Sequence, residues 1–398
     1  MKRTVWIFAT AIASVCFGSC EGLFTEGPKP GETFDVPLDG LTTKELAAFA
    51  RGDEAFSHEF SVPEGLGPIF NQVSCERCHP ADGRGNPRTV LIRFGRTAGG
   101  VTDPIPGEGG PQLQDRAIAG VDPEFLPPGV AVSPRIGPVV FGMGLMEAIP
   151  DSVLINREDP LDLDGDGISG RVNRVPAPEY AGGGGARVGR FGRKAGIPSL
   201  LQQIVTAYHQ DIGISSDYRP TEIDHPQSST PVRDDAPDPE LPASVLLDVQ
   251  FYLQTLAPPS RGAQTPEVIR GSSVFTGVGC ASCHTPTMRT GEHPVAALRE
   301  KDVQLYSDLL LHDMGPELAD NFYEGSATGT EWRTSPLWGL RLIGEFSGGV
   351  PTYLHDGRTS DLREVIRLHQ GEADSARFRF LQRTSADQEA LLRFLESL

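Results

Sequence analysis

The chain of 398 residues has 38% hydrophobic and 22% charged side chains, which excludes wholesale disorder and suits two or three domains. Its formal net charge of −18 would repel a phosphate backbone, which argues against nucleic acid as a partner. The 46 glycines and 34 prolines predict long irregular loops.

The N-terminus has the pattern of an export signal. Lys2 and Arg3 precede an apolar run that is too short to span a bilayer comfortably, and small residues lead up to Cys20. Because small residues followed by a cysteine resemble a bacterial lipoprotein cleavage site, we predict that residues 1–20 are a lipoprotein-type signal peptide. Ordinary signal cleavage nearby is the alternative. The mature protein would lie in the cell envelope, facing the periplasm, with membrane contact only through a lipid anchor.

Three helices are predicted in the first half of the chain, at residues 42–60, 200–208 and 246–256. The first begins with a capping-box pattern at Thr42 and Glu45 and continues with leucine and phenylalanine at roughly helical spacing. The third carries a leucine and valine stripe that stops before Pro258, where we place a domain boundary.

Two segments of the first half are predicted to be irregular. Residues 82–138 are rich in glycine and proline and have weak periodicity, which favours loops over regular elements. Residues 215–242 are dense in serine, aspartate and proline and contain almost no apolar run, which predicts an exposed loop.

Helix signals open and close the second half. Thr265 is a candidate N-cap, and Pro266 stands at the first helical position of a helix that runs into Cys280. Ser385 is predicted to cap a final helix with a leucine stripe that ends at Leu398. Each half therefore has a helix before a cysteine motif and a helix at its end, and we expect these two helices to cross.

The cysteine motifs are Cys75-x-x-Cys78-His79 and Cys280-x-x-Cys283-His284. This spacing is the attachment pattern of c-type haem. Two thiols about one helical turn apart can reach the two vinyl groups on one porphyrin edge, while the adjacent imidazole binds the iron. The sequence therefore predicts two covalently bound haems, with His79 and His284 as iron ligands.

A zinc site or a redox dithiol is the alternative for these cysteines. Zinc needs four ligands, and the pairs lie roughly two hundred residues apart rather than the ~15–20 of a zinc ribbon. We therefore expect a mainly α fold with long irregular loops and two cytochrome c-like haem domains. The N-terminal domain would span residues 41–257, with long loop insertions, and the C-terminal domain residues 263–398.

Six motifs carry a family resemblance over nearly all of the mature sequence. They are GLGPIFN (65–71), DGDGISGR (164–171), GRFG (189–192), LLLHDMG (309–315), WRTSPLW (332–338) and LHDGR (354–358). With these motifs the chain resembles the bacterial di-haem oxidoreductase family, also described as thiol oxidoreductase-like, which is related to the di-haem cytochrome c peroxidases.

The resemblance implies a second ligand for the C-terminal haem iron. In the peroxidase relatives, a His-Asp-Gly motif is followed fourteen residues later by the distal ligand, and counting from His355 reaches His369. Leu362 and Val365 would share a helix face with His369. A core histidine is the alternative. Ligation by His284 and His369 would make this haem a low-spin electron-transfer centre.

The first haem iron has no comparable second ligand. No histidine lies between His79 and His209 in the sequence. Met143 and Met146 are conceivable donors, although we expect them to pack in the core, and His58 and His209 are weaker candidates.

If the first iron has an open face, the resemblance implies that peroxide binds there. The peroxidase relatives place a glutamine and a glutamate at this face for proton transfer. Gln203 matches the glutamine, and Asp211 lies two residues short of the glutamate position; helix-surface polarity is the alternative for both. The relatives also carry a tryptophan between the haems, where this chain has Arg193. Trp332 and Trp338 are the nearest substitutes, and Trp338 is expected to be core.

An acidic loop is a candidate calcium site. Asp162, Asp164 and Asp166 alternate, and a glycine stands at the sixth position, as in a calcium-binding loop. Position twelve is Asn173 instead of glutamate, so a complete EF-hand is not expected. A capped acidic turn is the alternative to a structural calcium ion.

These patterns predict an enzyme that takes electrons at the C-terminal haem and reduces a small-molecule oxidant, peroxide, at the N-terminal haem. A small electron-donor protein, a cytochrome or cupredoxin, would be its partner. Two alternatives stay open. One is a pure electron-transfer cytochrome with both irons six-coordinate, and the other is an enzyme that oxidises a protein or metal-linked substrate with a high-valent haem pair.

Overall fold

Helices and short strands alternate along residues 36–398, which are the residues that the computed structural model describes. The predicted signal peptide at residues 1–20 lies outside them. The α-helices are α1 (Thr43–Ser57), α2 (Cys75–Cys78), α3 (Met143–Glu147), α4 (Asp151–Ile155), α5 (Leu200–Ala207), α6 (Ala243–Thr255), α7 (Pro266–Val278), α8 (Ile343–Phe346), α9 (Leu362–Leu368), α10 (Asp374–Leu381) and α11 (Ser385–Leu395).

The strands are short and pair mostly in twos. They are β1 (Ile69–Phe70), β2 (Leu91–Ala98), β3 (Val101–Asp103), β4 (Arg116–Ala117), β5 (Ala131–Arg135), β6 (Arg174–Pro176), β7 (Ala186–Val188), β8 (Met288–Arg289), β9 (Asp302–Val303), β10 (Leu311–Asp313) and β11 (Glu331–Arg333). Of the described residues, 34% are helical and 14% are in strands. The fold is therefore mixed, and the prediction of a mainly α fold was too simple.

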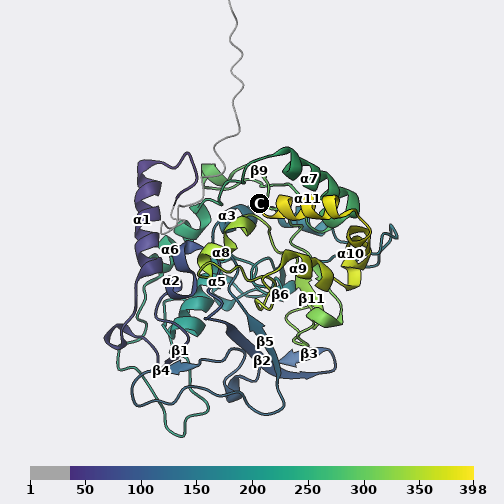
Figure 1. Cartoon of the computed structure of the whole chain (residues 1–398). Helices are drawn as coiled ribbons and strands as arrows, with labels where there is room; N and C mark the ends of the chain where they lie inside the picture. Colours follow the sequence, from purple (N-terminus) through teal and green to yellow (C-terminus); the bar gives the residue numbers. More distant parts are fainter. Residues whose placement is uncertain (1–35) are drawn as a thin grey trace, which may run out of the picture.

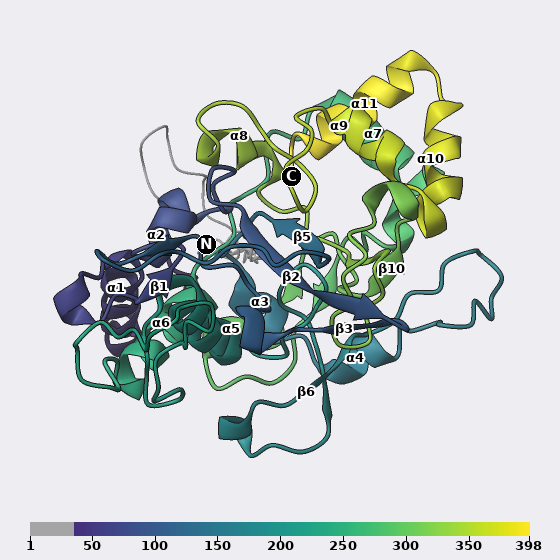
Figure 2. The ribbon, with the colours of Figure 1, turned by 90° about the horizontal axis from the view of Figure 1, so that it is seen from below.

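Two crossing helix pairs lie on opposite sides of the molecule (Figures 1 and 2). α1 packs on α6, and α7 packs on α11. Both crossings need a glycine, because a Cβ on Gly52 would collide with the carbonyl of Asp248, and one on Gly271 with the carbonyl of Ala390. Each half therefore contains the crossing helices that its sequence predicts.

Side-chain caps begin three of these helices. Thr42 and Glu45 form the predicted capping box of α1, in which the Thr42 amide donates to the Glu45 carboxylate at 2.8 Å. Thr265 caps α7 as predicted. The cap of α11 is Thr384 rather than Ser385. Thr384 and Ser385 both carry a hydroxyl group that can accept the capping hydrogen bond, so the sequence-based prediction put the helix start one residue late.

The C-terminal ends of two helices differ from the prediction. α1 ends at Ser57, so Phe60 lies beyond it, and Leu46 on α1 is 44% exposed instead of facing the core. α5 ends at Ala207 and continues as a π-helical turn, η6 (Tyr208–Ile212). Within residues 36–398, no helix is long and apolar enough to cross a membrane.

Residues 82–138 contain a three-stranded antiparallel sheet, in the order β3-β2-β5, instead of loops alone. β2 pairs with β5 from Leu91 opposite Arg135 to Gly95 opposite Ala131. Phe94, in the middle of β2, is fully buried. The paired strands are far apart in the sequence, so local periodicity carried little trace of the pairing.

The larger hydrophobic core contains side chains from both halves of the chain. It runs from Leu38 to Ala257 and also includes buried side chains between Met288 and Leu310. A smaller core fills the space around α7, α9, α10 and α11. The segment 288–310 of the second half therefore packs with the first half.

Candidate functional site

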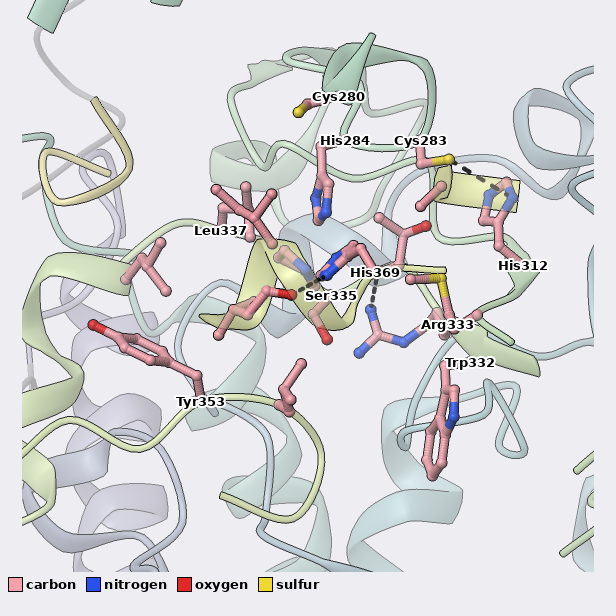
Figure 3. A pocket seen from close by; sticks show the side chains of 18 of the residues that line it. Cys280, Cys283, His284, His312, Trp332, Arg333, Ser335, Leu337, Tyr353 and His369 are labelled. Atoms are coloured by element: carbon pink, nitrogen blue, oxygen red, sulfur yellow. Dashed lines mark hydrogen bonds between the residues drawn. The ribbon is translucent and has the colours of Figure 1, made fainter. Parts of the chain in front are cut away.

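The second cysteine motif borders a cavity of about 290 Å³. α7 ends at Val278 and is capped by Gly279, whose φ of 98° favours glycine, and the next turn places Cys280, Cys283 and His284 on the cavity wall. His369, directly after α9, lines the same cavity. In Figure 3 the imidazole rings of His284 and His369 face the same space.

Backbone carbonyls orient both imidazole rings. Nδ1 of His284 lies 3.0 Å from the Tyr306 carbonyl oxygen, and Nδ1 of His369 lies 2.7 Å from that of Val365. Donation from Nδ1 leaves the lone pair of Nε2 for a metal. Burial lowers the pKa of His284 to about 4 and also lowers the pKa of His369, so both rings are neutral at pH 7. Two neutral imidazoles with available Nε2 atoms could together hold a haem iron.

The first motif repeats this arrangement. Phe56 of α1 lies 6.4 Å from the ring of His79, and Phe275 of α7 lies 6.3 Å from that of His284, with nearly equal tilts of 53° and 55°. In each half, the helix before the motif supplies the phenylalanine. Helix, motif and histidine therefore have the same local plan in both halves.

His79 has less free space around its ring than His284 has. Its Nδ1 lies 3.1 Å from the Gly83 carbonyl oxygen, and burial lowers its pKa to about 4. The Nε2 edge of the ring faces Gly137, where a Cβ would come within 3.0 Å of Nε2. The donor set fits haem, but the Gly137 backbone lies close to the atom that would bind iron.

The cavity beside the second motif, called the large cavity from here on, has a lining that suits haem. Much of the lining is apolar, and three guanidinium groups also border it, those of the buried Arg84 and Arg333 and of the half-buried Arg193. Burial and then repulsion from neighbouring arginines lower the pKa of Arg193 well below its usual range. The indole N–H of Trp338 is buried without a hydrogen-bond partner in the described chain. Guanidinium groups shielded from solvent and an indole N–H without a partner are complementary to the anionic propionates of haem.

His312 is part of this site, although the sequence analysis did not assign it a role. Its Nδ1 lies 2.7 Å from the Glu372 carboxylate, its Nε2 lies 2.9 Å from that of Asp308, and Cys283 Sγ is 3.8 Å from Nδ1. Burial alone would lower the pKa of His312, but hydrogen bonds to these partners raise it well above its usual value. The four-residue spacing of Asp308 and His312 was a visible signal, whereas Glu372 is distant in the sequence.

Asp211 lies beside the first motif. Its carbonyl oxygen accepts hydrogen bonds from the amides of Asn71 and Gln72, just before that motif, at 2.7 and 2.9 Å. Gln112 donates to its Oδ1 at 2.5 Å. Burial raises the pKa of Asp211 to about 6, above its ordinary 3.8. Gln203, in contrast, is half-buried on α5, and its side chain makes no hydrogen bond within residues 36–398.

The two tryptophans considered as substitutes for the one between the haems of the relatives lie in different surroundings. Trp332 stacks on His355 with ring centroids 3.7 Å apart and planes 15° apart, and both line the large cavity. Trp338 is 4% exposed and belongs to the larger core, as expected. Arg193, at the tryptophan position of the relatives, donates to the carbonyl oxygens of Ile136 and Gly137. Arg193 therefore braces the backbone that faces His79.

Two methionines were conceivable ligands of the first haem iron. Met143 and Met146 are each 5% exposed in the larger core, as expected, and both border the large cavity.

The acidic loop forms a different group from the one predicted. Carboxylate oxygens of Asp159, Asp162 and Asp164 lie within 4.8 Å of one another. Asp166 is outside this group, accepts a hydrogen bond from the Ile168 amide at 2.9 Å and borders the large cavity. Asp159 precedes the alternating run, so the sequence pattern does not reveal it. Calcium binding here stays a prediction.

Comparisons with known proteins add the family. The family described as "Di-haem oxidoreductase, putative peroxidase" matches residues 14–97 and 117–398, including both cysteine motifs. Curated proteins gave no match. Among solved structures, a Kuenenia stuttgartiensis hydrazine synthase is 13% identical over 100% of both chains, with a TM-score of 0.42. A MauG-like protein associated with microbial copper homeostasis is 15% identical over 93% of this chain and 94% of its own, with a TM-score of 0.41. These structural likenesses are too low to inform function. The family match covers most of the sequence, so this protein is an oxidoreductase that belongs to the di-haem oxidoreductase family.

Proposed function

We propose that this protein is an exported c-type di-haem enzyme that reduces peroxide at the haem of His79 with electrons that enter at the haem of His284. A bound haem iron would supply electron transfer and, where an axial position is open, peroxide binding. The export signal in the sequence supports a location in the cell envelope. Small cytochromes or cupredoxins are the proposed electron donors.

The asymmetry between the two motifs carries this proposal. His284 shares its cavity with His369, a second neutral imidazole. The Nε2 edge of His79 instead faces Gly137. An iron held by both His284 and His369 would keep no open position for a substrate, whereas Gly137 offers no donor atom from a side chain. This difference supports electron transfer at the second motif and substrate chemistry at the first.

Asp211 is the proposed proton carrier. A carboxyl group with a pKa of about 6 exchanges protons readily near neutral pH, which general acid–base catalysis requires. Gln112 holds Oδ1, so Oδ2 is the oxygen that would take up and deliver the proton. Gln203 is a second proposed residue, and its half-buried position on α5 offers weaker support.

Spectroscopy and turnover together test the proposal. The half-reduced protein is expected to show one low-spin haem and one high-spin haem that binds carbon monoxide or cyanide. It should also turn over hydrogen peroxide with a reduced cytochrome or dye as donor. Two low-spin haems that refuse these ligands in every redox state would instead favour the pure electron-transfer cytochrome.

A further inference from the structure

Four carboxylates of the loop between η6 and α6 gather in one place. Oxygens of Glu222, Asp238 and Glu240 lie within 4.8 Å of one another. The Asp234 carboxyl group is within hydrogen-bonding reach of Glu222. Glu222 is 8% exposed and Asp234 is 3% exposed, so part of this loop is buried, contrary to the prediction of an exposed loop. We call these four side chains the Glu222 carboxylate group.

The buried Asp234 side chain has an oxygen without a donor. Its Oδ1 accepts a hydrogen bond from the Ala236 amide at 2.7 Å, whereas its buried Oδ2 has no hydrogen-bond partner within the described residues. Oε1 of Glu240 is also buried without a partner. Buried carboxylate oxygens are costly unless a donor or a cation satisfies them. Burial first, and then Asp234, raise the pKa of Glu222 to about 7, which reports the same crowding of negative charge.

The nearby protein groups do not balance this charge. Arg233 lies 3.0 Å from Glu222 and 3.9 Å from Asp238, but its side chain is 62% exposed. Ser215 donates from Oγ to Asp238 at 2.7 Å and from its amide to Glu240 at 2.6 Å. Besides one largely solvated guanidinium, the four carboxylates are faced only by neutral donors, namely the Ser215 hydroxyl and the amides of Ser215, Asp234 and Ala236. This leaves an excess of negative charge in a partly buried place.

We propose that the Glu222 carboxylate group binds a divalent cation, and that this cation is calcium. The donors are all carboxylate oxygens, which a hard cation prefers, and the group contains neither an imidazole nor a thiolate for a transition metal. Calcium accepts irregular coordination by several carboxylates on a loop, whereas magnesium demands near-octahedral geometry. The bound ion would join two parts of the loop to Ser215, which follows the η6 turn that carries Asp211.

Asp234→Asn separates ion binding from a structural role of this side chain. Without calcium, asparagine removes one repelling charge and can donate a hydrogen bond to Glu222, so the variant should be at least as stable as the wild type. With calcium, the wild type should gain stability and the variant should not. If Asp234 were needed only for folding, Asp234→Asn would lower the melting temperature both with and without calcium.

The full-length, haem-loaded protein is first freed of metal with EDTA and then measured with 1 mM calcium chloride. We expect the melting temperature of the wild type to rise by about 3 °C, the size of a typical ligand linkage for a chain of this length, and that of Asp234→Asn to stay constant. Metal analysis after dialysis should find one calcium ion fewer per chain in the variant. Asp224→Asn, an exposed change in the same loop, should respond like the wild type.

Three results would overturn the proposal. They are a wild type without a calcium response, an Asp234→Asn variant that keeps the response and its calcium, and an equal response to magnesium chloride. If Asp234→Asn does not fold, Asp238→Asn is measured in its place, because that side chain is 26% exposed and tolerates substitution better. Asp162→Asn should leave this response intact, which separates the site from the acidic loop. The proposal is independent of peroxide turnover.

Discussion

Replacing Asp211 with asparagine is expected to raise stability and lower activity at neutral pH. Burial raises the pKa of the folded-state carboxyl from 3.8 to about 6. A group whose pKa is higher in the folded state contributes its full stability below the unfolded pKa and loses it as the pH rises through the folded pKa. The loss therefore falls between about pH 4 and pH 7. A difference of about two pKa units corresponds to about 3 kcal/mol, which is a ceiling because the carboxyl is partly exposed.

The variant isolates this contribution because asparagine has the same shape and can still accept the hydrogen bond from Gln112. The free energy of unfolding of haem-loaded Asp211→Asn should exceed that of the wild type by at most about 1 kcal/mol near pH 4.5, and by up to about 3 kcal/mol at pH 7.5. Peroxide turnover at pH 7 should fall by about 10²-fold if Asp211 moves the proton. Asp224→Asn serves as the exposed control.

Two results would refute this reasoning. If Asp211→Asn is less stable than the wild type by the same amount at both pH values, the carboxylate is stabilised in its charged form and its pKa is not raised. If stability changes as expected but turnover does not, Asp211 is buried and uncharged without a part in proton transfer. Either outcome is distinct from misfolding, which the haem spectrum reports.

Three further predictions concern the haem motifs and the helix crossings. His369→Ala should convert one haem from low to high spin while the haem is retained, and an unchanged electron paramagnetic resonance spectrum would exclude His369 as a ligand. Wild type should keep two haems per chain after denaturing acid-acetone extraction, and Cys283→Ala should keep roughly one firmly held; loss of both haems from the wild type would contradict covalent attachment. Gly271→Ala should cost about 1–3 kcal/mol in the free energy of unfolding, because its Cβ would collide with the Ala390 carbonyl, whereas Gly277→Ala on the same helix should be near neutral.

The features that could be predicted from the sequence depend on residues that are close neighbours along the chain. The capping box of Thr42 and Glu45 and the Thr265 cap depend on side chains within one helical turn of the amides they satisfy. The two cysteine motifs are equally local. For this reason the helices before the motifs, and the ligand-bearing turns themselves, could be predicted without tertiary information.

Contacts between distant residues were missed. The pairing of β2 with β5, the contact of His312 with Glu372, and the meeting of Asp234 with Glu222 depend on chain segments that the backbone brings together only after folding. Periodicity does not report such contacts. His369 is an intermediate case. The spacing in the peroxidase relatives predicted it as a ligand, but only the structure shows that it lines the same cavity as His284.

The shared core also limits how the chain can be divided. Buried side chains between Met288 and Leu310 belong to the core of the first half, so a cut near Pro258 would expose apolar surface on both fragments and favour aggregation over two separate single-haem proteins. The spacing of the two cysteine motifs is then set by side-chain packing instead of a linker. If each motif holds a haem, as proposed above, the same packed core would fix the distance that an electron has to cross between them.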